Sequence, residues 1–580
     1  MSTLLTSPES GSPKRRNGSF ESEVRAAQSA PTIVVSKPTP EIPWHRRTWV
    51  IALTGSVLMF AALPPLDLWP LAWIAPLPWL LLVRQRELLG RRPYLTLWAA
   101  GFVFWLAAIH WIRLPHPILY VGWVAITFYL AFYIPVFVGL CRVAVHQLKL
   151  PLVVAAPVVW FGLELAKGHL ITGFTMGSLG HSQVHWLAAI QISDLFGSYA
   201  VSALVIFVAA CFARMIAWDG AAWHVWPLAP LAAVMAAVLG YGSWQLREPA
   251  QKPDYGPRIA LIQGSFTPEL KSDPAMDEVI HGRYLGLSGT AVVKSWRERL
   301  PVDLVVWPET MYRNPLFTFD ESFQLPDDLV FPNGRKKTKA DFDDSSRLKM
   351  AEQSFKLRTP LLTGVMRIHG NSDGRVLNYN SAALVAPDGS LHGYYDKMHL
   401  VMFGEYIPFT DVFPWLYDLT PVSGGAEPGK GPAAFTIGNA RIAPNICYET
   451  TIPHLIRNQV VALREQGAEP DILVNVTNDG WFRGSSELDM HLACGVFRAI
   501  ECRKPLLIAA NTGFSAWIDA NGKVVKQAKR FEDDAIIAEP ILDHRRSLYL
   551  TLGDWPAAIC LIFCCGLAVI GRKYEVRSMK

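Results

Sequence analysis

Eight apolar segments, each about 20 residues long, constrain this chain more than any other feature of its sequence. A helix of about 20 apolar residues crosses the ~30 Å hydrocarbon core of a bilayer. Seven segments precede a long polar stretch and one follows it, and they lie near residues 48–66, 68–83, 94–112, 118–141, 150–166, 193–217, 224–244 and 549–571. We therefore predict a multi-pass α-helical membrane domain of about eight spans, which excludes a wholly soluble or a disordered protein.

The composition agrees with this prediction. Of the 580 residues, 51% are hydrophobic and only 18% are charged, whereas roughly a quarter of the residues of a soluble domain carry a charge. The net charge of +5 is too small to suggest binding to nucleic acid. Five of the eight cysteines lie in apolar segments, and Cys447, Cys494 and Cys502 form no CxxC pair. The cysteines therefore indicate neither a disulfide scaffold nor a zinc site, and we expect no metal and no cofactor.

The hydropathy pattern divides the chain into five parts. Residues 1–43 are rich in Ser, Pro, Lys and Arg, which predicts a disordered cytoplasmic tail. The other parts are a seven-helix transmembrane domain at 44–246, a globular domain at 257–541, a C-terminal transmembrane helix at 547–572 and a short cytoplasmic tail at 573–580. In this division the globular domain is inserted between the seventh span and the eighth.

Lys and Arg are enriched in the cytoplasmic loops of membrane proteins, so their distribution indicates the orientation. With the N-terminus in the cytoplasm, 13 basic residues lie on the cytoplasmic side, whereas the opposite short loops carry only Arg113 and Lys167. Arg247, Arg545 and Arg546 flank the globular domain and count against this orientation, but a large translocated domain follows the rule only weakly. We therefore expect the globular domain outside the cytoplasm.

Between residues 257 and 541 the pattern changes to short apolar runs separated by helical segments. The runs predict strands at 258–264, 303–309, 360–367, 380–389, 440–449, 471–479 and 505–513. The segments between them favour helices at 275–299, 344–358, 452–466 and 486–503. Alternating strands and helices indicate an α/β domain whose sheet is covered by helices. We interpret the charged stretch 331–350 as a solvated loop.

Three residues of this domain have side chains suited to chemistry. Glu309 ends the apolar run LVVWPE, at the carboxyl end of a predicted strand, where α/β folds place their sites. Lys397 follows a strand–turn–strand pattern. Cys447 lies at a predicted strand-to-helix turn, where helix amides and a nearby cation lower the pKa of a thiol. Taken alone, each residue is better explained by packing or solvation. Gaps of 88 and 50 residues separate the three, so only tertiary folding can bring them together.

The sequence motifs around these residues indicate a family more specifically than the three residues alone do. WPE, then GYYDKMHL, then NICYE, in that order, resemble the nitrilase (carbon–nitrogen hydrolase) superfamily. The resemblance extends to its membrane-bound branch, the apolipoprotein N-acyltransferases, through IALIQGSFTPELK, DKMHLVMFGEYIPF and TNDGWF, and covers about residues 45–570. Met402 and Ser272 depart from the usual residues of that branch. The resemblance implies a nitrilase-type αββα sandwich inserted into the membrane domain.

The resemblance also implies a Glu–Lys–Cys triad formed by Glu309, Lys397 and Cys447. Glu309 would take the proton of Cys447, whose thiolate would attack an ester carbonyl of a phospholipid, the acyl donor. Lys397 and a backbone N–H next to Cys447 would stabilise the oxyanion. The acyl chain would then pass to the N-terminal amine of a diacylglyceryl-modified apolipoprotein. The implied location is the bacterial inner (cytoplasmic) membrane, with the globular domain on the periplasmic side.

Several further residues have two interpretations each. Glu405 either takes part in catalysis or only holds Lys397 through a salt bridge. Tyr448 and Glu449, directly after the candidate nucleophile, either bind the substrate by shaping an acyl site or serve core packing and helix capping. We interpret His491 as a structural hydrogen-bond partner rather than a proton shuttle.

Glu164 and Lys167 are i,i+3 neighbours near the end of the fifth span, so we expect them to share a helix face and pair. Such a pair either lies at the membrane interface or faces a substrate, because charged groups inside a membrane segment are costly.

Two other functions stay compatible with the sequence. A membrane-tethered amidase would hydrolyse a small amide with the same triad, and water would be its second nucleophile. A lipoprotein-binding or transport protein would carry a vestigial triad, although the small number of charged residues within the spans disfavours transport. A stable acyl-thioester on Cys447 favours the transferase over the amidase.

Overall fold

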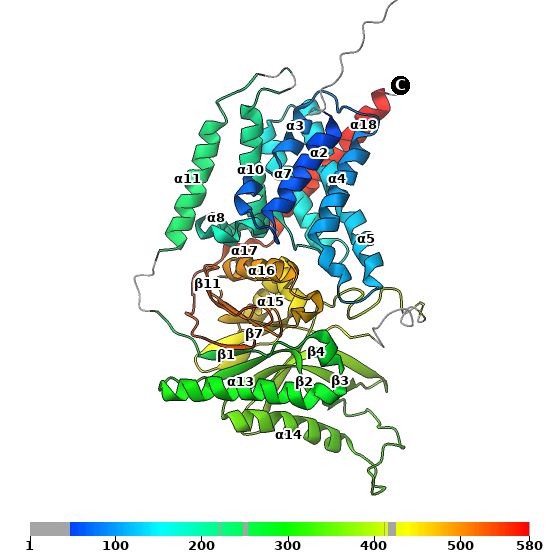
Figure 1. The fold of residues 1–580 in the computed structure, drawn as a ribbon, viewed down its shortest axis with the longest axis vertical. Coiled ribbons are helices and arrows are strands. Elements are labelled where there is room, and N and C mark those ends of the chain that lie inside the picture. The colour runs from blue at the N-terminus through cyan, green and yellow to red at the C-terminus, as the bar shows by residue number, and fades with distance from the viewer. Residues whose placement is uncertain are drawn as a thin grey trace, which may run out of the picture. The chain divides into compact units, whose positions relative to one another are not determined.

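The computed structural model describes residues 47–218, 220, 222–247, 253–410, 412–413, 415 and 425–578. The predicted cytoplasmic tail at 1–43 lies outside the described residues. Within the described part, apolar helices precede and follow an α/β domain along the chain (Figure 1).

Helices occupy all the predicted apolar segments. They are α2 (Thr48–Ala62), α3 (Leu77–Arg84), α4 (Pro93–Ala108), α5 (Leu119–Leu130), α6 (Tyr133–Arg142), α7 (Leu152–His169), α10 (Ser198–Met215), α11 (Leu228–Gln245) and α18 (Trp555–Ser578). Five segments of the described chain are long and apolar enough to cross a membrane: Leu119–Gln147, Leu152–His169, Ser198–Met215, Leu228–Gln245 and Trp555–Lys573. Thr48–Ala62, Trp69–Arg84 and Pro93–Ala108 are shorter apolar helices. The figure of about eight spans therefore depends on these three and stays a prediction.

Proline explains why the second apolar segment is broken into short pieces. η2 (Trp69–Trp73) and α3 each have a proline in the first turn, and Pro76 directly precedes α3. Proline suits the start of a helix, because its missing N–H would have no partner there. In a helix interior the same residue removes a hydrogen bond and clashes with the preceding turn. The segment therefore forms two short helices instead of one long one.

The globular domain contains two six-stranded sheets, ordered β12-β1-β2-β3-β4-β5 and β11-β10-β9-β8-β7-β6. The strands of the first sheet are β1 (Ile259–Gln263), β2 (Leu304–Phe319), β3 (Leu361–Gly370), β4 (Val376–Val385), β5 (Leu391–Asp396) and β12 (Asp534–Ala538). Those of the second are β6 (Phe435–Ile437), β7 (Ala440–Ile446), β8 (Ile472–Thr477), β9 (Leu506–Ala510), β10 (Ala516–Ile518) and β11 (Val524–Gln527). In each sheet three central strands are parallel and the outer ones pair antiparallel.

Apolar side chains on both faces of the sheets explain why two layers of helices cover them. Leu261 and Val306 of the first sheet pack against Ile442 and Val474 of the second and form the core between the sheets. On the outer faces, α13 (Asp277–Arg297) and α14 (Lys339–Leu357) cover the first sheet, and α15 (Pro453–Glu465) and α16 (Glu487–Cys502) cover the second (Figure 1). This order of layers is the predicted αββα sandwich.

The interpretation of 331–350 as a loop is wrong for its second half. α14 begins at Lys339, directly after a capping box in which Thr338 Oγ1 accepts a hydrogen bond from the backbone N–H of Asp341. The Asp341 carboxylate in turn accepts the backbone N–H of Thr338 at 2.7 Å. These reciprocal bonds satisfy two N–H groups of the first turn and start the helix despite its charged sequence.

One buried ion pair and one buried hydrogen bond join α16 and the residue that follows it to the membrane helices. Arg503 Nη2 lies 2.5 Å from Asp194 Oδ2, and both side chains are buried. Asp194 belongs to α9 (Ser193–Phe196), which directly precedes α10. Glu501 accepts the backbone N–H of Ser198, the first residue of α10, at 2.7 Å and pairs with Arg498 at the same distance. Removing one partner of a buried pair is strongly destabilising, so these contacts fix the domain against the helices.

Candidate active site

Glu309 lies inside β2 and not at its end, where the sequence placed it. The strand continues to Phe319, and its pairing with β3 shifts register between Trp307 and Tyr312. Thr310 adopts a φ of 52° at this irregularity. An irregularity of this kind bends a strand and redirects its side chains, and such features are common next to active sites. The sequence indicated the strand as far as Glu309 but could not show that it continues to Phe319.

The Glu309 carboxylate is held from two sides. Its side chain is only 10% exposed. Oε1 accepts a hydrogen bond from Asn380 Nδ2 at 2.7 Å, and Oε2 accepts the backbone N–H of Asn478 at 3.0 Å. Gly364 of β3 makes this arrangement possible, because a Cβ there would lie 2.5 Å from the Cα of Glu309. The carboxylate therefore has a fixed direction.

Lys397 directly follows β5 and forms the centre of a buried cluster. Its Nζ lies 2.9 Å from both carboxylate oxygens of Glu405 and 3.5 Å from Glu309 Oε1. Asn380 Nδ2 donates to both carboxylates, at 2.7 Å and 2.8 Å. The backbone N–H of Val401 donates to Glu405 Oε2 at 2.9 Å. Two carboxylates, one amine and one amide therefore form a single network.

The two carboxylates keep Lys397 charged. Burial alone would lower the pKa of Lys397, but Glu405 and Glu309 overcome that effect and raise it. The contact acts in the opposite direction on Glu405, because burial would raise its pKa and Lys397 holds it below the ordinary value. At neutral pH Lys397 is therefore an ammonium group and Glu405 a carboxylate.

Cys447 lies at the turn between β7 and α15, as predicted, and is the first residue of η8 (Cys447–Thr451). Its φ of 52° is in the left-handed region, which costs a residue with a side chain about 1–3 kcal/mol. Asn475 Nδ2 supports the turn by donating to the Cys447 carbonyl oxygen at 3.1 Å and to Asn445 Oδ1 at 2.7 Å. The cysteine side chain is half-buried.

The expectation of a lowered thiol pKa is wrong for this structure. Burial raises the pKa of Cys447 well above its ordinary value, and the charge of Glu309 adds to the rise, while Lys397 opposes it. The thiol is therefore protonated at rest, and its attack on a carbonyl needs a base. Glu309 is the carboxylate whose charge acts on the thiol most strongly, which suits that role.

Glu449 connects the lysine segment to the cysteine strand. It is fully buried. Its Oε1 accepts the backbone N–H groups of Met398 and His399 at 2.7 Å and 3.0 Å, and its Oε2 accepts that of Ile446 at 2.7 Å. The Tyr395 hydroxyl donates to both oxygens at 2.9 Å. These contacts favour the capping and packing role of Glu449 over contact with a substrate.

Tyr448 points from the cysteine turn toward the membrane helices. Its hydroxyl donates to the carbonyl oxygen of Gly173, in the loop after α7, at 2.7 Å. Its ring stacks on His399 with centroids 6.1 Å apart, and it packs against the apolar core of the membrane helices. In the same region Trp111 makes an edge contact with Phe482 at 5.1 Å. This position agrees with an acyl site shaped by Tyr448.

Two polar residues of the site were missed from the sequence. Asn380 lies inside a predicted strand, where an amide is usually unremarkable. Lys271, in α12 (Pro268–Ser272), donates from Nζ to the carbonyl oxygen of Glu309 at 3.4 Å and to the Thr310 hydroxyl. Burial lowers the pKa of Lys271 to about 8. The motif IALIQGSFTPELK ends at Lys271 and contributes to the family resemblance, but it does not assign a role to this lysine.

A second polar cluster lies close to Cys447. Asp479 Oδ1 accepts hydrogen bonds from the Thr477 hydroxyl at 2.7 Å and from His491 Nδ1 at 3.2 Å. Glu487 Oε1 lies 4.0 Å from the same nitrogen, and the three groups have ligand atoms within 4.8 Å of one another. Burial raises the pKa of Glu487 well above its ordinary value. A neutral Glu487 and hydrogen bonds already formed within the cluster favour the structural role predicted for His491.

The arrangement suits nucleophilic acyl transfer. A fixed carboxylate and a permanent ammonium charge belong to one buried network, and both charges act on a protonated thiol that lies on a strained turn. A carboxylate that can accept the thiol proton and a cation that can stabilise an oxyanion are the two elements that such a reaction needs.

Family profiles match two parts of the chain. The profile described as the apolipoprotein N-acyltransferase N-terminal domain matches residues 55–211, and the carbon-nitrogen hydrolase profile matches residues 278–548. The chain is 30% identical over 573 residues to an apolipoprotein N-acyltransferase of Rhodopirellula baltica, covering 92% of this chain and 99% of the relative. It is 33% identical over 539 residues to one of Geobacter metallireducens, covering 90% and 95%.

Two solved structures are also similar to the chain. A CN-hydrolase superfamily protein of Xanthomonas campestris is 21% identical with a TM-score of 0.33, covering 52% of this chain and 96% of that one. A carbon-nitrogen hydrolase of Helicobacter pylori is 15% identical with a TM-score of 0.35, covering 52% and 94%.

Proposed function

The chain belongs to the apolipoprotein N-acyltransferase family, and from this premise we propose that Glu309, Lys397 and Cys447 carry out its acyl transfer. The acyl donor is a phospholipid, and the acceptor is the N-terminal amine of diacylglyceryl-cysteine in an apolipoprotein. Transfer proceeds through a thioester on Cys447 and completes the maturation of the lipoprotein.

In the first half of the reaction, Glu309 takes the proton of the thiol and Cys447 Sγ attacks the ester carbonyl carbon of the phospholipid. Lys397 Nζ and a backbone N–H beside Cys447 stabilise the tetrahedral oxyanion. The ester C–O bond breaks, and the proton on Glu309 passes to the departing alkoxide oxygen. Lysophospholipid leaves, and the acyl chain stays on the sulfur as a thioester.

In the second half, the α-amino group of the diacylglyceryl-cysteine attacks the thioester carbonyl carbon. Glu309 takes a proton from the amine, and the same donors stabilise the second oxyanion. The C–S bond breaks, the proton returns to the sulfur, and an amide forms on the acceptor. Two acyl-transfer steps of moderate difficulty thus replace one difficult step.

The observation that carries this proposal is the convergence of Glu309 and Glu405 on Lys397, with the charges of Glu309 and Lys397 acting on the Cys447 thiol. We assign Glu405 to holding and charging Lys397, because it lies nearer to Nζ than Glu309 does. We assign Tyr448 to the acyl site, because its hydroxyl contacts the loop after α7. An amphipathic donor approaches such a site from the bilayer.

The proposed location is the bacterial inner membrane, with the domain at 257–541 on the periplasmic side and the segments 44–246 and 547–572 in the bilayer. The distribution of Lys and Arg supports this orientation. A single cysteine placed at the exposed residue Lys529, in an otherwise unreactive background, tests it. An impermeant thiol reagent added to intact inner-membrane vesicles of known orientation labels this cysteine only from the periplasmic side.

The decisive product assay mixes the purified full-length protein with a phospholipid and a diacylglyceryl-cysteine peptide. Mass spectrometry of the peptide is expected to show a gain of one amide-linked acyl chain, and Cys447→Ala is expected to abolish it. Release of free fatty acid with an unmodified peptide would contradict the transferase and favour a hydrolase.

A further inference from the structure

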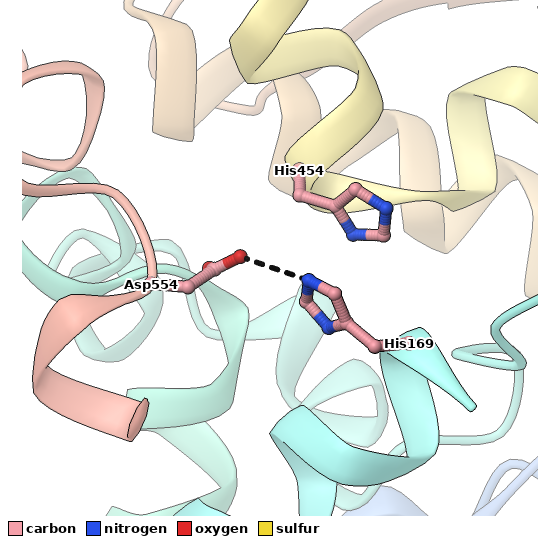
Figure 2. Close-up of side chains that lie close together, drawn as sticks. All are labelled: His169, His454 and Asp554. Atoms are coloured by element: carbon pink, nitrogen blue, oxygen red, sulfur yellow. Dashed lines mark ion pairs between the residues drawn. The ribbon is translucent and has the colours of Figure 1, made fainter. Parts of the chain in front are cut away.

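Two histidines and one aspartate from separate segments lie together at one end of two apolar helices, α7 and α18 (Figure 2). His169 is the last residue of α7, His454 is the second residue of α15, and Asp554 directly precedes α18. A ligand atom of each residue lies within 4.8 Å of the others. None of the three takes part in the proposed reaction, so their convergence needs its own explanation.

His169 contacts a backbone carbonyl through one ring nitrogen and the aspartate through the other. Its Nδ1 lies 3.0 Å from the carbonyl oxygen of Leu165, which is the kind of partner that the second ring nitrogen of a metal-bound histidine has. Its Nε2 lies 3.5 Å from Asp554 Oδ2, and the dashed line in Figure 2 marks this ion pair. The place between these two atoms suits a metal cation that both can bind.

The aspartate has the support that metal-binding carboxylates have. Asp554 Oδ1 accepts a hydrogen bond from the Tyr549 hydroxyl at 2.8 Å, which leaves Oδ2 directed toward His169. Metal-bound carboxylates are themselves hydrogen-bonded, and metal-bound histidines donate their second ring N–H to a carbonyl or a carboxylate. Both kinds of support are present here.

His454 adds a second imidazole. Its ring stacks on that of His169, with centroids 4.0 Å apart and an interplanar angle of 21°. Its Nδ1 is buried without a hydrogen-bond partner, and Figure 2 shows this nitrogen on the side of the ring that faces His169 and Asp554.

Two neighbours of His454 are engaged in other contacts. Arg498 is paired with Glu501 at 2.7 Å. His399 stacks on Tyr448. Neither side chain is a hydrogen-bond partner of His454 Nδ1.

We propose that His169, His454 and Asp554 form a binding site for a divalent metal ion of the zinc class. Two imidazole nitrogens and one carboxylate oxygen, with a fourth position for water, are a ligand set that Zn²⁺ accepts. The His169 side chain is 42% exposed. It can turn out of the stacked arrangement until its lone pair points at the ion, and the same exposure gives the ion a route from solvent. This proposal replaces the expectation of no metal site.

Such a site would join two apolar helices to the α/β domain close to the cysteine. α7 leads into the loop whose Gly173 accepts the Tyr448 hydroxyl, and α15 begins six residues after Cys447. An ion that binds the folded protein and not the unfolded chain stabilises the fold in proportion to the logarithm of its concentration. The site therefore acts as a clamp on this junction and supplies no step of the reaction.

The test uses the full-length protein in detergent, freed of metal with a chelator and dialysed against ZnCl2. Bound zinc is counted by mass spectrometry, and CoCl2 serves as a spectroscopic probe of the ligands. We expect one Zn²⁺ per chain, a rise in Tm with zinc, and loss of both in His169→Ala and in Asp554→Asn. Tyr549→Phe, which removes only the hydrogen bond to Asp554, is expected to weaken binding about 10- to 100-fold.

The control is another histidine–aspartate pair, His185 and Asp67, whose atoms lie 2.8 Å apart and whose histidine is about as exposed as His169. His185→Ala is expected to bind zinc like the wild type. A wild-type protein that binds no zinc, or variants of His169 and Asp554 that bind as the wild type does, would overturn the proposal. Zinc counting does not depend on acyl transfer, and the Asp554→Asn variant keeps the stacked rings of His169 and His454.

Discussion

Two buried lysines of this protein differ in their partners: one contacts carboxylates and the other contacts a hydroxyl. Lys397 in the α/β domain contacts two carboxylates that arrive from other parts of the chain. Lys167 in α7 has a glutamate three residues away, Glu164, yet its Nζ donates to Ser178 Oγ at 3.1 Å and lies 5.4 Å from the ring centre of Trp105. Among the described residues, no ion pair joins Glu164 and Lys167, so the pairing expected from their spacing is wrong.

The difference in partners between Lys167 and Lys397 shows how a buried lysine comes to contact carboxylates. An i,i+3 spacing brings two side chains onto one helix face, but the loop after α7 supplies Ser178 as a nearer partner. Lys397 gains its partners from β2 and from the segment after β5, at separations of 88 and 8 residues. Convergence through tertiary structure, and not neighbourhood in sequence, produces the permanent charge beside Cys447.

The largest expected effect is on the rate of acyl transfer, and it distinguishes Lys397 from Lys167. Lys397→Met removes the proposed oxyanion donor, which typically costs about 10²–10³ in rate, and leaves two carboxylates without their cation. We expect acyl transfer to fall at least about 10³-fold, whereas Lys167→Met stays within about tenfold of the wild type. Rates are measured with the peptide assay at equal concentrations of folded protein. Equal losses in the two variants would contradict the comparison.

The next effect separates the two carboxylates that share Lys397. Glu309→Gln removes the proposed base, and general-base catalysis contributes about 10²–10⁴ in rate. Glu405→Gln keeps the hydrogen-bonding shape and weakens only the hold on Lys397, so we expect a loss of about tenfold. Single-turnover rates with labelled phospholipid distinguish the two. A larger loss of rate in Glu405→Gln than in Glu309→Gln would contradict the assignment of Glu309 as the base and of Glu405 as the partner that holds Lys397.

The contact between the domain and the membrane helices supplies a prediction on stability. Asp194→Asn leaves Arg503 buried without its counter-charge, and breaking a buried pair costs about 3–5 kcal/mol. The matched control is Glu269→Gln, whose partner Arg483 is exposed, as Glu269 is; exposed pairs contribute about 0–1 kcal/mol. Thermal unfolding in detergent measures both. Similar Tm values for the two variants would show that the Asp194 pair does not hold the domain.

The smallest effect concerns Lys271, whose pKa burial lowers from 10.5 to about 8. Below pH 8 folded and unfolded chains both carry the proton, and the cost of burying it is fully present. Between about pH 8 and 10.5 only the unfolded chain binds the proton, so stability rises with pH by at most about 1.4 kcal/mol per unit. We expect the Tm of the wild type to rise relative to Lys271→Met across this range. The exposed Lys529→Met is the control and should show no such trend.

The sequence predicted the layers of the fold because hydropathy and periodicity are local properties. Each predicted strand overlaps an observed one. The motifs around Glu309 and Lys397 contain residues that the fold brings into one network, and the charges of both act on the Cys447 thiol. The thiol pKa, the capping role of Glu449 and the contribution of Lys271 escaped prediction. They depend on burial and on contacts such as that between Glu449 and His399, which join segments about 50 residues apart. Spacing along the chain carries no information on them.

The most direct test of the proposed mechanism is a pulse–chase experiment that follows a labelled acyl chain onto and off Cys447. The full-length protein is incubated with acyl-labelled phospholipid and no acceptor, and the peptide containing Cys447 is isolated under acidic conditions. We predict one labelled acyl chain per active protein, bound as a thioester that hydroxylamine releases and that the diacylglyceryl-cysteine peptide discharges into an amide. Label that never reaches Cys447, or an acyl-cysteine that water discharges as fast as the peptide does, would contradict the transfer mechanism.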